Sequence, residues 1–203
     1  MAIMSTRPAI GPIKTRWRNK KVPRTLEERA GMIGANIWKV SLAIYKHLEK
    51  DGFRFGSDNQ VTQVITEFIA FLVQLTDRTA YGLCSDEDRA ILINALASHL
   101  AKTLENNQED LFGPGNYKEP FVKTLNDRFE DYARFEYTDR QPSYVCLRYF
   151  ADKVAGVMAV SDNKWVAEQM LDVEAPEMVR LIKKLVEETV VANAAQASDK
   201  LQP

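Results

Sequence analysis

The chain has 203 residues, of which 45% are hydrophobic and 27% are charged, a balance that fits one globular domain and excludes a disordered or fibrous protein. Its two cysteines cannot form a disulfide framework, and no basic segment leads into an apolar stretch of the signal-peptide kind. We therefore expect a cytoplasmic protein. No membrane span is expected either, because Glu67, Gln74 and Asp77 interrupt the most apolar stretch of the sequence.

Residues 1–24 form a basic segment whose composition differs from the rest of the chain. It contains three prolines and seven lysines or arginines, and the first acidic residue is Glu27. The prolines and the lack of a helical period predict an extended arm outside the domain. Removing those seven leaves 20 basic residues against 28 acidic ones, so the remainder of the chain is acidic. The arm is compatible with binding to nucleic-acid phosphates, to anionic lipid or to the protein's own acidic body.

The first predicted helix runs from Thr25 to about Asp51. Thr25 and Glu28 have the spacing of a capping box, and Gly52 follows as a stop signal. Apolar residues recur at steps of four and three along one face: Leu26, Ala30, Ile33, Ile37, Val40 and Ile44. This seam could pack inside a bundle or against a second copy of the chain. His47 continues the register near the helix end, where a positive charge complements the helix dipole.

The most apolar helix is expected between Ser57 and Gly82, and we expect it to be central. Ser57 and Gln60 fit the capping-box spacing, and the apolar face behind them widens almost all the way round the helix. Polar residues nevertheless recur along one side: Glu67, Gln74, Asp77, Arg78 and Tyr81. Two interpretations stay open. The stripe is either a solvent-facing strip or a network that joins helices, or it is the polar wall of a ligand pocket.

Five further helices are expected after the central one. They cover residues 85–106, 119–138, 142–160, 162–171 and 176–192. Ser85 precedes three acidic residues that favour a helix start, and Pro142 suits a first helical turn. A stop is expected near Asp172, before Pro176 opens the last helix.

Two segments between and after these helices are expected to be irregular. Residues 107–118 contain Gly-Pro-Gly and predict a loop of functional length. That loop lacks the lysine and hydroxyl that close a phosphate-binding loop, so we do not expect it to hold a nucleotide. The alanine-rich polar end, residues 193–203, is expected to be frayed.

Aromatic side chains concentrate between Phe112 and Phe150, where ten of the chain's nineteen aromatic residues fall. Three tyrosines and two arginines of this region have the composition that protein-contact surfaces favour: Tyr137, Arg140, Tyr144, Arg148 and Tyr149. The alternative is that the tyrosines cap the core with their hydroxyls in water.

The sequence offers few ways to build a catalytic or metal centre. His47 and His99 are the two histidines of the chain, and neither has a glutamate three residues before it, as paired carboxylate metal sites require. Cys84 and Cys146 are too few and too far apart in sequence for a cysteine zinc site. Cys84 lies at a helix start, which favours a thiolate, but three adjacent acidic residues oppose it. We therefore expect no metal, no cofactor and no enzyme activity.

These patterns predict an all-α fold, a single irregular antiparallel bundle of six or seven helices over residues 25–192. We expect a non-enzymatic interaction or adaptor protein that forms a homo-oligomer or binds another protein. The first alternative is a small-ligand binder or sensor whose pocket is lined by the polar side of the second helix. The second alternative is a nucleic-acid-binding protein that uses the basic arm.

Overall fold

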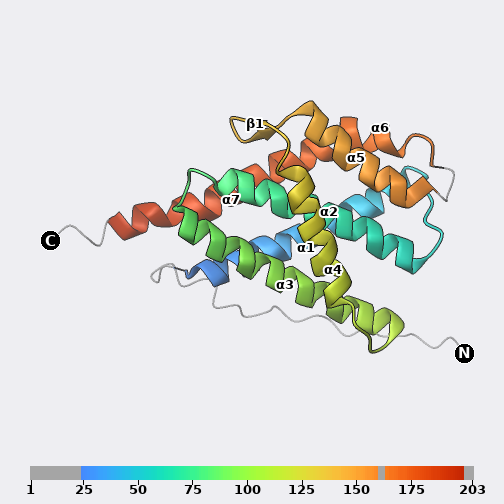
Figure 1. Cartoon of the computed structure of the whole chain (residues 1–203), viewed down its shortest axis with the longest axis horizontal. Coiled ribbons are helices and arrows are strands. Elements are labelled where there is room, and N and C mark those ends of the chain that lie inside the picture. The colour runs from blue at the N-terminus through green and yellow to red at the C-terminus, as the bar shows by residue number, and fades with distance from the viewer. Residues whose placement is uncertain (1–23, 160–162, 199–203) are drawn as a thin grey trace, which may run out of the picture.

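The computed structural model describes residues 24–159 and 163–198 and confirms the all-α prediction (Figure 1). Its helices are α1 (Leu26–Lys50), α2 (Asp58–Ala80), α3 (Asp86–Phe112), α4 (Lys118–Tyr132), α5 (Tyr144–Met158), α6 (Val166–Gln169) and α7 (Ala175–Ser198). Two short strands, β1 (Tyr137–Thr138) and β2 (Gln141–Pro142), form an antiparallel hairpin between α4 and α5. The predicted arm, apart from its last residue, and the end of the predicted tail lie outside the described residues.

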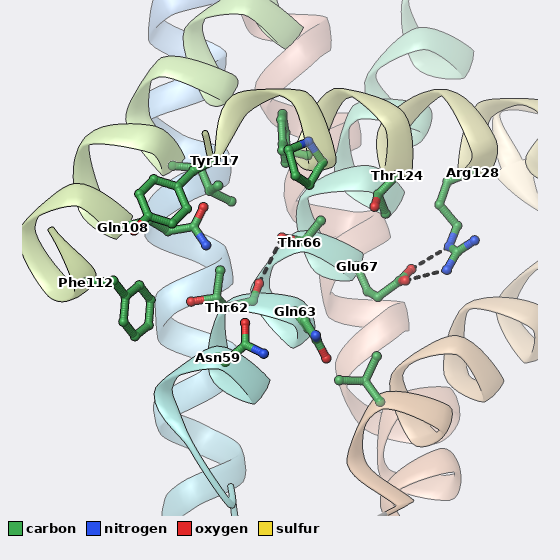
Figure 2. A pocket seen from close by; sticks show the side chains of 14 residues that line it. Asn59, Thr62, Gln63, Thr66, Glu67, Gln108, Phe112, Tyr117, Thr124 and Arg128 are labelled. Atoms are coloured by element: carbon green, nitrogen blue, oxygen red, sulfur yellow. Dashed lines mark hydrogen bonds and ion pairs between the residues drawn. The ribbon is translucent and has the colours of Figure 1, made fainter. Parts of the chain in front are cut away.

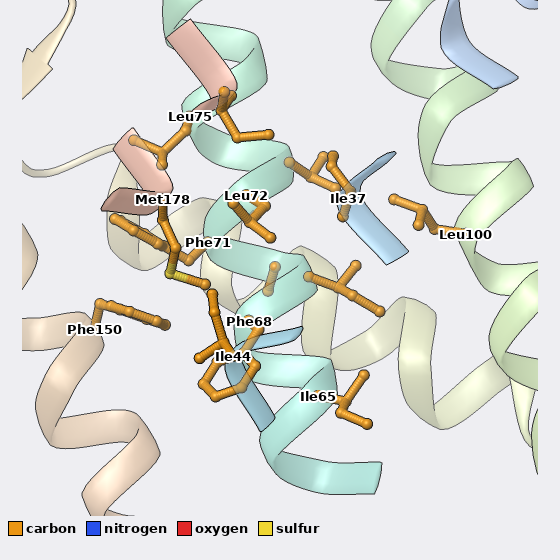
Figure 3. Packing of buried hydrophobic residues seen from close by; sticks show 14 of the residues in the cluster. Ile37, Ile44, Ile65, Phe68, Phe71, Leu72, Leu75, Leu100, Phe150 and Met178 are labelled. Carbon is orange, nitrogen blue, oxygen red and sulfur yellow. The ribbon is translucent and has the colours of Figure 1, made fainter. Parts of the chain in front are cut away.

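α2 is the central helix of the bundle, as predicted. It contacts α1, α3, α4, α5 and α7, and most of its residues are buried. The ring of Phe71 stacks on Phe150 of α5 with centroids 4.1 Å apart, and Figure 3 shows both rings beside Met178 of α7 in the core. Burial of each such side chain contributes about 1.5–3 kcal/mol.

No helix of the described ranges is both long enough and apolar enough to cross a membrane.

α1 turns its predicted apolar seam inward and packs chiefly against α3. The buried residues of the seam are Ala30, Ile33, Ile37 and Ile44. Thr25 and Glu28 form the predicted capping box, with both hydrogen bonds 3.2 Å long. Gly34 lets the two helices approach closely, because a Cβ atom there would lie 2.5 Å from Cδ2 of His99. The seam is therefore used inside the bundle.

The region between α4 and α5 differs from the predicted helix over 119–138. α4 ends at Tyr132, and the chain then turns into the β1–β2 hairpin, so Pro142 lies in a strand. Asp139 and Arg140 form the turn with positive φ angles of 51° and 62°. Two such residues give a tight turn the twist that an antiparallel pair needs. Ser143, the next residue after β2, caps α5.

The chain stays helical from α6 into α7, so the stop predicted near Asp172 is wrong. A π-helix, Met170–Glu174, joins the two without a break. In a regular α-helix Pro176 would leave the carbonyl of Asp172 without a donor and its ring would clash there. The wider π turn just before the proline accommodates both effects and keeps the helix continuous.

Candidate functional site

The structure divides the predicted polar stripe of α2 between two cavities and two side-chain contacts. Glu67 lines one cavity, and Arg78 and Tyr81 line the other. Between them, Gln74 is buried and forms a hydrogen bond with Tyr137 of β1. The last member, Asp77, accepts a hydrogen bond from Arg89 of α3 at 2.5 Å. The five residues therefore do not line one pocket.

The first cavity, which we call the threonine cavity, lies between α2, α3 and α4 and has a volume of about 570 Å³ (Figure 2). α3 reaches Phe112 rather than ending near Asn106, so the loop before α4 spans only residues 113–117 and places Tyr117 at the cavity. Six of its lining residues have amide or threonine side chains, namely Asn59, Thr62, Gln63, Thr66, Gln108 and Thr124.

Most hydroxyl protons around the threonine cavity are already used by the protein. Thr66 Oγ1 donates to the carbonyl of Thr62 at 2.8 Å, and the Tyr117 hydroxyl donates to the carbonyl of Gly113 at 2.9 Å. Such side-chain bonds to the backbone leave the oxygens only as acceptors. The cavity therefore offers amides, acceptors and rings, with no net charge to select an ion.

A buried ion pair closes one side of the threonine cavity. Arg128 of α4 donates from Nε and Nη2 to the two carboxylate oxygens of Glu67 at 2.7 and 2.5 Å, as Figure 2 shows. The hydrogen bonds to Glu67 raise the pKa of Arg128. Arg128 also lies 3.7 Å from Asp131, whose carboxylate accepts a hydrogen bond from the hydroxyl of Tyr149. Because each charge already has a partner, we assign this network to the stability of the wall.

The second cavity, which we call the arginine cavity, has a volume of about 680 Å³. The end of α2, the hairpin and α7 supply its lining: Arg78, Tyr81, Gly82, Phe135, Tyr137, Asp139, Arg140 and Lys183. Three of these side chains are cations and one is a carboxylate. The cavity thus combines an excess of positive charge with three aromatic rings.

Arg78 is the least compensated of the three cations. Its guanidinium lies over the ring of Tyr137, 5.2 Å from the centroid, and its Nε is buried without a hydrogen-bond partner in the described part of the chain. Within those same ranges Arg78 has no ion pair, since its neighbour Asp77 pairs with Arg89 instead. A buried polar nitrogen without a partner is unfavourable unless a ligand or water supplies an acceptor.

The hairpin holds the other side of the arginine cavity. Arg140 lies 3.6 Å from Glu187 of α7, and Lys183 Nζ donates to the carbonyl of Asp139 at 3.3 Å. The positive φ of Arg140 is an uncommon conformation for a long side chain, and such conformations concentrate at functional sites. Burial raises the pKa of Tyr137 well above its usual range, so this ring stays neutral beneath Arg78.

The five residues of the predicted contact surface lie in three environments. Tyr137 and Arg140 line the arginine cavity, whereas Tyr149 packs edge-on against Tyr132 with centroids 5.4 Å apart. Tyr144 and Arg148 remain on the outer surface of α5, where Tyr144 is 66% exposed. Only part of this set is therefore accessible to a partner.

Both thiols are poor nucleophiles in this structure. Burial, reinforced by Asp88, raises the pKa of Cys84, and burial raises the pKa of Cys146. Cys146 is fully enclosed and lies 3.3 Å from the hydroxyl of Tyr137. Neither site has the electropositive, accessible surroundings that activate a cysteine.

Most lining residues of the two cavities were not identified from the sequence, including the cations Arg128 and Lys183. Arg128 follows Glu67 by 61 residues, and Lys183 has the ordinary place of a lysine on an amphipathic helix. Neither carries a local pattern that sets it apart from other surface cations. Only the packing of α4 and α7 against α2 reveals their positions.

Comparison of the chain with models of known protein families, with curated proteins and with solved structures finds no match. The class is therefore defined by the fold and the two cavities alone: an all-α bundle with a neutral polar cavity on one side of its central helix and a cationic, aromatic one at that helix's end.

Proposed function

We propose that this protein binds a small anionic ligand in the arginine cavity and acts as a non-enzymatic binding protein or sensor. The observation that carries the proposal is Arg78, a partly buried guanidinium with neither an ion pair nor a partner for its Nε among the described residues. An isolated cation loses solvation on burial, and an anion restores that loss. The planar fork of arginine suits carboxylate and phosphate groups, which accept two parallel hydrogen bonds.

The other two cations of the arginine cavity also favour an anionic ligand. Arg140 has one carboxylate, that of Glu187, at 3.6 Å, and Lys183 donates to a neutral carbonyl. With Arg78 they place three positive charges around a space that has one acidic lining residue, Asp139. A pocket with this balance attracts anions and repels cations.

The aromatic lining narrows the ligand class further. Tyr81, which is 62% exposed, joins Phe135 and Tyr137 on the walls of the arginine cavity. Ligand pockets are mostly apolar with a few polar groups that fix orientation. We therefore expect a phosphate or carboxylate attached to a flat apolar group, rather than a free inorganic anion, as the preferred ligand.

A thermal-unfolding screen of anionic metabolites tests this proposal. A ligand present at about 100 times its Kd adds about 2.7 kcal/mol of stability, which raises the unfolding temperature of a chain this size by roughly 5–11 °C. Stabilising compounds should share an anionic group, and they should not raise the unfolding temperature of Arg78→Gln. Arg148→Gln is the matched control, since Arg148 is an exposed arginine paired with Asp152. The proposal fails if no anion stabilises the protein, or if Arg78→Gln responds like the unaltered chain.

A second candidate function is contact with another protein or a second copy of this chain. It rests on exposed residues of α5 and at the start of α6, two helices that pack together. Tyr144, Val145 and Trp165 are 66%, 61% and 72% exposed, and aromatic residues are enriched at protein interfaces. Light scattering at increasing concentration tests self-association. Oligomers that persist in the double variant Tyr144→Ser with Trp165→Ser would exclude this surface as their contact.

A further inference from the structure

Four polar side chains meet where the end of α1 packs near the π-helix. His47 Nδ1 lies 2.6 Å from Oε1 of Glu174, and its Nε2 lies 3.3 Å from Oδ2 of Asp51. The amide nitrogen of Gln169 lies 3.2 Å from Asp51 and 3.1 Å from Glu174. His47 and Glu174 are 127 residues apart in sequence, so only the fold brings this group together.

The group has more negative than positive charge. Glu174 is 4% exposed and Asp51 lies beside it, yet in the described ranges neither carboxylate forms an ion pair with a lysine or arginine. Their ion-pair partner is His47, which neutralises at most one of them, and Gln169 is uncharged. A buried carboxylate requires a compensating charge. The surroundings of Glu174 therefore favour a further cation.

The π-helix is the element that places Glu174 in this group. Its wider turn, Met170–Glu174, follows α6 directly and ends with the buried glutamate next to α7. Single π turns within longer helices occur frequently at functional sites. The π-helix also precedes Pro176. The same element therefore accommodates the proline and positions the carboxylate of Glu174 beside His47.

We propose that His47, Asp51 and Glu174 bind a divalent transition-metal ion, with zinc as the best fit. One ligand atom from each residue lies within 4.8 Å of the other two. Zinc bonds to imidazole nitrogen and carboxylate oxygen are about 2.0–2.2 Å, so two ligand atoms on one tetrahedral ion are about 3.4 Å apart. Glu174 and Asp51 contact different nitrogens of the His47 ring, and one ion takes only one of them, so binding requires the exposed His47 and Asp51 side chains to rotate.

The donor set selects among cations. Imidazole nitrogen favours zinc and other first-row transition metals, whereas calcium and magnesium prefer oxygen ligands alone. Three protein ligands leave a fourth position on a tetrahedral ion. The amide nitrogen of Gln169 now faces Asp51 and Glu174. If the amide rotates by half a turn, its carbonyl oxygen takes the place of the nitrogen and can fill the fourth position.

Calorimetric titration of the untagged full chain with zinc, after removal of metal by a chelator, tests this site. One equivalent should bind, and Glu174→Gln and His47→Gln should each weaken the affinity at least about tenfold. His99→Gln removes the other histidine and should leave the affinity unchanged. Cobalt should give the absorption bands of a four-coordinate ion in the unaltered chain and not in His47→Gln.

A second variant covers the risk that a change at buried Glu174 disturbs the fold. Asp51→Asn alters a partly exposed ligand, so its helical circular dichroism should match the unaltered chain while its zinc affinity falls. Zinc should also raise the unfolding temperature of the unaltered chain and of His99→Gln, but not of His47→Gln. The proposal is overturned if zinc fails to bind stoichiometrically, or if His47→Gln binds it as tightly as the unaltered chain. In either case the group is a histidine bridge between two carboxylates.

Discussion

Arg128 of α4 holds both carboxylate oxygens of Glu67 on the central helix, at 2.7 and 2.5 Å. Glu67 is buried, so replacing its partner would leave an uncompensated charge inside the bundle. Arg128→Met should therefore lower the free energy of unfolding by about 3–5 kcal/mol. Urea denaturation monitored by circular dichroism measures this change.

Two further variants separate the ion pair from general effects of losing an arginine. Arg134→Met removes an exposed arginine of the same region and should change stability by less than about 0.5 kcal/mol. The double variant Glu67→Leu with Arg128→Met removes both charges and should recover much of the loss. If the double variant is less stable than Arg128→Met alone, the pair does not act through its buried charge.

Gly34 and Gly31 lie one turn apart on α1 and should respond to alanine in opposite directions. A Cβ at Gly34 would lie 2.5 Å from Cδ2 of His99 and 3.3 Å from Cδ1 of Leu96, whereas a Cβ at Gly31 meets nothing within 4 Å. Gly34→Ala should destabilise the protein by about 1–3 kcal/mol through overpacking. Gly31→Ala should stabilise it by about 0.5–1 kcal/mol because alanine favours the helix. Thermal unfolding of both variants decides whether α1 and α3 approach as closely as the structure has them.

The raised pKa of the Tyr45 hydroxyl should make the folded state less stable at alkaline pH. Burial, with a hydrogen bond to Glu49 at 2.6 Å, raises the pKa of Tyr45 from 10.0 to about 12. The folded state thus keeps a proton that the unfolded state releases, so this contribution is present below pH 10 and is lost as pH rises to about 12. Between pH 9 and 12 the free energy of unfolding, measured with urea, should fall less steeply with pH for Tyr45→Phe than for the unaltered chain. Equal slopes for the two proteins would contradict the raised pKa.

The central place of α2 and the start of α1 could be predicted because both depend on local patterns. Apolar residues surround α2 on nearly all sides, so it is stable only inside the bundle. The capping box of Thr25 and Glu28 is formed by residues close in sequence. The hairpin could not be predicted in this way. Its turn uses Asp139 and Arg140 at positive φ, and Arg140 stands where glycine is the usual signal.

The candidate sites depend on long-range packing, which explains why the sequence predicted them only in part. The periodic spacing put Arg78 and Tyr81 in one predicted set, and both line the arginine cavity, although α2 ends one residue before Tyr81. That spacing had no information on Arg140 and Lys183, which reach the cavity from the hairpin and α7. The buried Glu174 is the last residue of the π-helix, an element that no periodic pattern of the sequence indicates. Partners distant in sequence therefore decide which polar residues form a site.

Side-chain NMR of arginine offers the most direct measurement of the central claim. In the ¹H–¹⁵N spectrum the Nε–H signal of Arg78, assigned by its loss in Arg78→Lys, reports on a nitrogen that has no partner within the described residues. Titration with phenyl phosphate, which carries a phosphate on a flat apolar ring, should shift this signal in a saturable way while the signal of Arg148 stays in place. An unmoved Arg78 signal, or equal shifts at both arginines, would contradict anion binding in the arginine cavity.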